Sequence, residues 1–214
     1  MITITAFKWV PPMAQGLVRD LRVRWALEEA GLAYNVRLID GSVQRTEDYL
    51  AMQPFGQVPV MIEDNLTLFE SGSIVLRIGE RSEALLPRDE AEKARAVTWV
   101  FSALNSIEIA IMQLSQIDLF YAKEEWAIAR RPAAEQWVRQ RLADLANALG
   151  DKPYLEGRFT AGDLIMVTVL RILRHTDLVA EHANLAVYVA RCEARPAFLR
   201  ALEGQMSAFR AHAA

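Results

Sequence analysis

The stretch Pro54-Phe55-Gly56-Gln57-Val58-Pro59-Val60 decides the fold that we expect for this chain. A proline that enters a strand directly from a turn is unusual, because a sheet needs the backbone N–H group that proline lacks. If the Val58–Pro59 bond is cis, the turn leaves the N–H and C=O of Val58 pointing outward, ready to pair with an extended peptide. The alternative is a trans proline at the start of an edge strand, since only about 5–6% of such bonds in folded proteins are cis.

Short strands and helices alternate on both sides of this stretch. Residues 2–7 alternate apolar and polar side chains, and residues 36–39 form a second β-branched run, which predicts two strands. Apolar positions over 17–27, with Gly31 as a stop signal, predict a helix between them and hence a parallel pair. The rest of the predicted order β-α-β-α-β-β-α is a helix within 42–52, strands at 58–62 and 66–69, and a helix from Ser71.

A helical periodicity replaces the strand pattern in the second half of the chain. Apolar residues recur every three or four positions over 97–114, and residues 122–149 continue in the same style. The most apolar stretch, 164–173, is about half of the roughly 20 residues that a membrane-spanning helix needs, so it predicts a buried helix. The predicted organisation is an α/β domain at 1–81, a linker at 82–87 and an all-helical domain at 88–214.

The composition is that of a globular protein with no general attraction for nucleic acid. Of the 214 residues 52% are hydrophobic and 24% are charged, and the formal net charge is −3. A nucleic-acid adaptor would depend only on the local cluster of Arg19, Arg22 and Arg24. We therefore expect neither a nucleic-acid partner nor a membrane partner.

Cysteine and histidine usage bounds the location and the metal chemistry. Cys192 is the only cysteine, so an intrachain disulfide is excluded, and a reducing cytoplasmic location is the expectation, with no export signal visible. We expect Cys192 to be a core or surface thiol rather than a nucleophile. The histidines, at 175, 182 and 212, are too scattered to suggest a metal site, so no metal is expected.

Two further segments carry polar residues at predicted helix starts. At Glu70-Ser71, the serine and the first free N–H groups of the helix can bind a carboxylate, and Glu70 can pair with an ammonium group. The alternative is an ordinary N-cap beside a solvated glutamate. Thr160 and Asp163 have the spacing of a capping box, so we expect them to be structural.

Taken together and in this order, these segments resemble the glutathione S-transferase superfamily, in its bacterial, cytosolic form. The resemblance spans nearly the whole chain and lies in the segments 22–32, 54–59, 68–71, 159–163 and 195–198. It implies a thioredoxin-like N-terminal domain, an all-helical C-terminal domain and usually a homodimer.

The resemblance also implies an activity and a binding site. The implied reaction conjugates the glutathione thiolate to a small electrophile, as in detoxification, while isomerisation, dehalogenation and peroxide reduction stay open. Pro59 would be cis and the backbone of Val58 would contact the cysteinyl unit of glutathione. Glu70 and Ser71 would hold its γ-glutamyl group, and Gln57 is a weaker candidate for its glycine carboxylate.

One departure bears on catalysis. Relatives usually carry a Tyr, Ser or Cys between the first strand and the first helix, but residues 7–19 contain no hydroxyl or thiol. A thiol with an ordinary pKa of about 8.5 is mostly protonated at neutral pH. We expect the N-terminus of the first helix, with free N–H groups near 17–19, to stabilise the thiolate, with Gln15 and Arg19 as side-chain candidates. The alternatives are a loop that only packs and a non-catalytic protein that binds glutathione or a partner.

Overall fold

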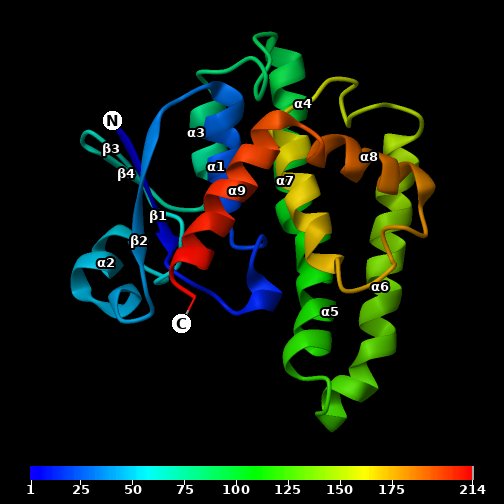
Figure 1. The fold of residues 1–214 in the computed structure, drawn as a ribbon. Coiled ribbons are helices and arrows are strands. Elements are labelled where there is room, and N and C mark those ends of the chain that lie inside the picture. Colours follow the sequence, from blue (N-terminus) through cyan, green and yellow to red (C-terminus); the bar gives the residue numbers. More distant parts are fainter. Residues whose placement is uncertain (214) are drawn as a thin grey trace. The chain divides into compact units, whose positions relative to one another are not determined.

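The computed structural model describes residues 1–213, which form two compact units (Figure 1). Unit 1 comprises Met1–Leu86 and Ala194–Ala214, and unit 2 comprises Pro87–Glu193. The division predicted from the sequence differs from this one, because it placed all of 88–214 in the helical domain. The last residue of that predicted domain, Ala214, lies outside the described residues.

Unit 1 is an α/β domain built on one mixed sheet. The strand order is β2-β1-β3-β4, with β1 and β2 parallel and the other neighbours antiparallel. This arrangement confirms the predicted order β-α-β-α-β-β-α and the thioredoxin-like fold class. The elements are β1 (Ile2–Phe7), α1 (Asp20–Ala30), β2 (Tyr34–Ile39), α2 (Glu47–Met52), β3 (Met61–Glu63), β4 (Leu66–Leu68), α3 (Ser71–Gly79) and, from the end of the chain, α9 (Pro196–Ala211).

Two boundaries in unit 1 differ from the sequence-based expectation. β3 begins at Met61 rather than at residue 58, because residues 57–60 form the turn that leads into it. The helix expected from residue 17 begins at Asp20. Gly16 has a φ of 75°, a backbone conformation that favours glycine, and the N–H of Leu17 bonds to the carbonyl of Ala14. The chain therefore turns before α1 starts.

The C-terminal helix α9 belongs to unit 1 because it packs along α1. The fully buried ring of Trp25 meets that of Phe198 edge to face, with the ring centroids 4.8 Å apart. The guanidinium of Arg195 donates from Nε and Nη2 to both carboxylate oxygens of Glu29, at 2.6 and 2.8 Å. Trp25 Nε1 also donates to Glu29, so this carboxylate joins the two helices.

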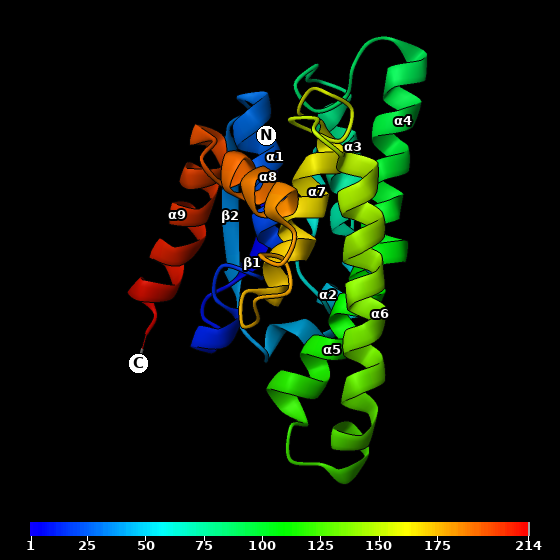
Figure 2. The same cartoon turned by 90° about the vertical axis from the view of Figure 1, so that its right-hand side faces the viewer.

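Unit 2 is a helical bundle around the buried helix α7 (Figure 2). Every residue of α7 is buried, which confirms the predicted buried helix, although a 3₁₀ turn replaces its last three residues. Gly162 allows close approach to α4, because an added Cβ would lie 2.5 Å from the Cβ of Trp99. The elements are α4 (Glu90–Phe101), a π-helical turn (Ser102–Ile107), α5 (Glu108–Phe120), α6 (Glu125–Leu149), α7 (Ala161–Leu170) and α8 (Ala183–Glu193).

One helical run in unit 2 passes a simple test for a membrane span. The run Glu90–Phe120 is 31 residues long, its most apolar window has a mean hydropathy of 1.3, and 39% of that window is buried. A core helix of a bundle meets the same criteria by length and composition alone. Ala103, Ile111 and Leu114 of this run are fully buried inside unit 2.

Candidate functional site

The turn before β3 carries the first part of the candidate site. The Val58–Pro59 peptide bond is cis, and the side chain of Val58 is only 8% exposed. Among residues 1–213, neither the N–H nor the carbonyl of Val58 has a hydrogen-bond partner. The neighbouring Gln57 has an exposed side chain. Since buried backbone groups are almost always paired, Val58 is a place where a peptide ligand can supply the missing partners.

The N-terminus of α3 carries the second part. Glu70 is the N-cap residue and has a φ of 66°, a left-handed conformation that costs a non-glycine residue about 1–3 kcal/mol. Ser71 follows as the first helical residue and is buried, whereas the Glu70 side chain is exposed. The rings of Phe55 and Phe69 meet edge to face with centroids 6.2 Å apart. This contact joins Phe55, three residues before Val58, to the residue that precedes Glu70.

Arg22 is a residue of this site that the sequence reasoning missed. Its guanidinium Nη1 donates to Ser71 Oγ at 3.3 Å, and Arg22 is only 3% exposed. A buried cation therefore contacts the hydroxyl of the first residue of α3. The available signal was an arginine at an interior position of an apolar helix, where charged residues are rarely buried without a partner.

The arginine cluster that suggested nucleic-acid binding is not a surface patch. Arg22 and Arg24 are both 3% exposed, and only Arg19 is exposed. Arg24 Nε donates to Asp20 Oδ2 at 2.8 Å, and Gln205 on α9 donates to the other oxygen at 2.6 Å. Burial raises the pKa of Asp20 above its usual range, although the Arg24 charge opposes this. Two of the three arginines in the cluster are thus buried within unit 1.

The loop between β1 and α1 carries the two side chains considered for catalysis. Gln15 is half-buried and its amide donates to the carbonyl of Val10 at 3.1 Å, so it braces the loop. Arg19 is the exposed N-cap residue of α1. The expectation of a free N–H at Leu17 is wrong, because the preceding turn already binds it.

Thr160 and Asp163 form a capping box at the start of α7. Thr160 Oγ1 accepts from the N–H of Gly162, and Asp163 Oδ2 accepts from the N–H of Thr160 at 2.9 Å. The other carboxylate oxygen accepts from the N–H of Leu155 at 2.9 Å and from the hydroxyl of Tyr188 at 3.0 Å. Burial raises the pKa of Asp163 despite these hydrogen bonds. The predicted capping box is thus present, and these hydrogen bonds join the start of α7 to Leu155 and Tyr188.

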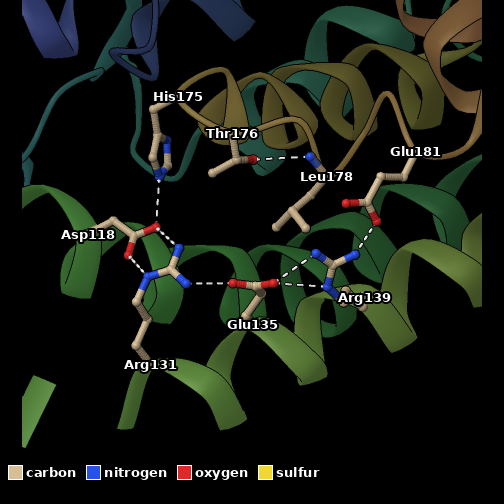
Figure 3. Close-up of polar contacts among 8 residues, drawn as sticks. All are labelled: Asp118, Arg131, Glu135, Arg139, His175, Thr176, Leu178 and Glu181. Carbon is tan, nitrogen blue, oxygen red and sulfur yellow. Dashed lines mark hydrogen bonds and ion pairs between the residues drawn. The ribbon is translucent and has the colours of Figure 1, made fainter. Parts of the chain in front are cut away.

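A second polar cluster lies in unit 2, between α5, α6 and the segment after α7 (Figure 3). Arg131 donates to both oxygens of Asp118, at 2.7 and 3.2 Å, and His175 Nε2 lies 3.3 Å from the same carboxylate. Glu135 accepts from Arg131 and from Arg139. Hydrogen bonds to Asp118 and Glu135 raise the pKa of Arg131. The acidic and basic side chains pair with one another. Because they come from α5, α6 and the segment after α7, their contacts join these three segments.

Within the described residues, the histidines and the cysteine form no candidate metal centre. His175 meets Asp118 although 57 residues separate them, which the scattered spacing of the histidines did not suggest. Within residues 1–213 there is no group of three or more His, Cys, Asp or Glu side chains that could hold a metal ion. Cys192 is fully buried in α8.

Comparison with known proteins gives the family context. Residues 6–79 match the family model described as the glutathione S-transferase N-terminal domain. The curated relative glutathione S-transferase F14 of Arabidopsis thaliana is 27% identical over 194 residues, which cover 82% of this chain and 76% of the relative.

Solved structures share the fold over nearly the whole chain. A glutathione transferase family member from Pseudomonas fluorescens pf-5, with two glutathione bound, has a TM-score of 0.83 at 22% identity and covers 94% of this chain and 92% of its own. The theta class glutathione S-transferase from Xanthomonas axonopodis pv. citri, with glutathione bound, has a TM-score of 0.78 at 27% identity and covers 94% and 96%. These findings confirm the resemblance drawn from the sequence.

Proposed function

Starting from the relationship of this chain to the glutathione S-transferase superfamily, we propose that it binds glutathione in unit 1 and transfers the glutathione thiolate to a small electrophile. The observation that carries the proposal is the backbone of Val58, which has no hydrogen-bond partner among residues 1–213, beside the cis bond to Pro59. The cysteinyl unit of glutathione offers one amide N–H and one carbonyl, which match the N–H and carbonyl of Val58 as an added strand. Glutathione in the two solved relatives supports this ligand.

The start of α3 suits the γ-glutamyl end of the same ligand. Because Arg22 donates to Ser71 Oγ, the serine hydroxyl is left to donate its own proton outward to a carboxylate. The first N–H groups of α3 add donors, and a helix N-terminus favours an anion. The exposed carboxylate of Glu70 then pairs with the α-ammonium group, and the exposed amide of Gln57 with the glycine carboxylate.

Activation of the thiol is assigned to the start of α1. Arg19 is the exposed cation at the N-cap, and an opposite charge close to a thiol lowers its pKa. The helix dipole of α1 acts in the same direction. Gln15 takes a lesser part in this proposal because its amide already donates to Val10.

A second candidate function is a non-catalytic glutathione-binding or partner-binding protein. The specific observation in its favour is that residues 7–19 contain no hydroxyl or thiol. Isomerisation, dehalogenation and peroxide reduction would use the same glutathione site. A cytoplasmic location, a homodimer and a role in detoxification complete the proposal.

Calorimetry with glutathione, combined with ultraviolet titration of the bound thiol, tests the proposal. A transferase should bind glutathione with a micromolar to millimolar Kd and hold the bound thiol well below its ordinary pKa of about 8.5. Turnover of a panel of small electrophiles should follow. Binding with an ordinary thiol pKa and no turnover would favour the non-catalytic function, and no binding would refute both.

A further inference from the structure

We propose that Thr5 and Tyr49 are positioning residues for the Val58 turn. They form a buried hydrogen-bond chain that fixes the residues on either side of the Val58–Pro59 bond, so that the backbone of Val58 stays presented to the ligand. This inference rests on the proposed glutathione site and adds two residues, from β1 and α2, that have no contact with the ligand in that proposal.

The hydrogen-bond chain contacts the turn on both sides of the Val58–Pro59 bond. The hydroxyl of Tyr49 donates to the carbonyl of Gln57 at 2.8 Å. Beyond the turn, the N–H of Val60 donates to Thr5 Oγ1 at 2.8 Å, and the N–H of Thr5 donates to the carbonyl of Val60 at 2.9 Å. Thr5 Oγ1 and Tyr49 Oη lie 3.0 Å apart and close the chain.

The chemistry of the groups settles which atom donates at each step. The carbonyl of Gln57 can only accept, so the single proton of the Tyr49 hydroxyl goes to it. Thr5 must then donate its own proton to Tyr49 Oη, while its lone pairs accept from Val60. The order is therefore Thr5 to Tyr49 to Gln57, and hydrogen bonds in such a chain strengthen one another.

The surroundings make this arrangement hard to replace. Thr5 and Tyr49 are 0% and 1% exposed, and the Tyr49 ring packs in an apolar cluster with Ile39, Val58 and Val60. Burial raises the pKa of Tyr49, so its hydroxyl stays protonated and able to donate at neutral pH. A group that loses its partner here has little access to water, and an unpaired buried polar group is costly.

The hydrogen-bond chain affects ligand binding through the backbone groups of Val58, which it leaves unpaired. Gln57 and Val60 are both held, and the N–H and carbonyl of Val58 between them have no partner among residues 1–213. If the Gln57 carbonyl loses its donor, the turn loses one of its two fixed ends. Ordering the N–H and carbonyl of Val58 would then cost free energy when the ligand binds, and this cost would weaken binding.

The test compares glutathione affinity, measured by calorimetry, in Tyr49→Phe and Thr5→Val with that of the unchanged protein. Each variant keeps its shape and removes one hydroxyl, and we expect each to raise the Kd about tenfold, equivalent to about 1.4 kcal/mol. Tyr34→Phe on β2 and Thr3→Val on β1 remove hydroxyls elsewhere in the same sheet and should leave the Kd unchanged. Thr5→Ser keeps the hydroxyl and should restore the affinity.

A glutathione analogue that is N-methylated at the cysteinyl amide separates positioning from a general loss of stability. The analogue cannot donate to the Val58 carbonyl, so the unchanged protein and Tyr49→Phe should bind it equally weakly. The positioning role is overturned if Tyr49→Phe loses the same factor of affinity for glutathione and for the N-methylated analogue. It is also overturned if the Kd for glutathione is unchanged in Tyr49→Phe and Thr5→Val. If Tyr49→Phe does not fold, the comparison of Thr5→Val with Thr5→Ser decides in the same way. If the unchanged protein binds no glutathione, the proposed function fails first and this inference with it.

Discussion

The guanidinium of Arg22 on α1 donates to the hydroxyl oxygen of Ser71 on α3 across 3.3 Å, and both side chains are buried. This contact places a cation behind the first residue of a helix whose leading N–H groups have no helical partner. The serine hydroxyl is thereby committed as an acceptor on its inner side and is available as a donor on its outer side. A ligand carboxylate at this point would meet the hydroxyl, the N–H groups and the field of the cation together.

Arg22→Gln should therefore weaken glutathione binding about tenfold, because it removes a charge-assisted hydrogen bond worth about 1.5–3 kcal/mol. Calorimetry measures the change. Arg77→Gln is the matched control in α3, where the exposed Arg77 pairs with Glu80, and it should bind as the unchanged protein does. A glutathione analogue without the α-carboxylate should not distinguish Arg22→Gln from the unchanged protein. If it does, Arg22 supports the fold rather than the carboxylate site.

Arg19→Ala should raise the pKa of the bound glutathione thiol by about one unit, because it removes a cation from the start of α1. Ultraviolet titration of the complex gives this value directly. Arg19→Lys should preserve the lowered pKa, and Arg210→Ala, an exposed arginine of α9, serves as the charge control. Gln15→Ala should change it little, since the Gln15 amide braces the loop at Val10. Equal thiol pKa values in Arg19→Ala and the unchanged protein would remove Arg19 from catalysis.

Phe198→Ala should destabilise unit 1 by about 3–5 kcal/mol, because it leaves a cavity against the fully buried ring of Trp25. Leu199→Ala, one residue away and 54% exposed, should change stability little. Hydrogen exchange of the α1 amides is the appropriate measurement, since it reports on unit 1 alone. Unchanged protection of α1 in Phe198→Ala would contradict the assignment of α9 to this unit.

Gly162→Ala should destabilise unit 2 by about 1–3 kcal/mol, because the added methyl group would lie 2.5 Å from the Cβ of Trp99. Neither atom sits at the end of a flexible side chain, so the helices α4 and α7 must move apart. Gly204→Ala in α9 is the matched control, because an added Cβ there would lie 3.4 Å from Nη1 at the tip of Arg24, and it should be neutral or stabilising. Chemical denaturation of the two variants decides the point.

Asp163→Asn should lower stability by at least about 2 kcal/mol, because an amide nitrogen replaces one of two oxygens that each accept from buried donors. The pH dependence has a definite sign. The folded pKa of Asp163 is raised above 3.8, so its contribution to stability is full below 3.8 and declines as the pH rises through the folded value. The variant lacks this decline.

The stability difference between the unchanged protein and Asp163→Asn should accordingly be larger near about pH 4 than near about pH 7. Denaturation curves at the two pH values give the comparison. Thr160→Ser, which keeps the capping hydroxyl, is the control for the helix start and should not alter the pH dependence. A difference that grows with pH would mean that burial does not dominate the titration of this carboxylate.

The sequence determined the features whose causes lie within a few residues. The alternating β-branched run at Ile2–Phe7, the stop at Gly31 and the capping box at Thr160 follow from side-chain period, glycine conformation and local hydrogen bonds. The order of elements and the two-part fold class followed from them. The turn at Val58 was located by its unusual proline.

Only the tertiary structure decided which distant groups meet. Arg22 reaches Ser71 across 49 residues, Tyr49 reaches Thr5 across 44, and Arg195 reaches Glu29 across 166. No local propensity encodes such pairs, because each depends on how helices and strands pack after they have formed. For the same reason the sequence placed α9 in the helical half, and it could not show that Arg22 and Arg24 are buried. What the sequence by itself supplied was the set of chemical groups, and packing decided which of them share a site.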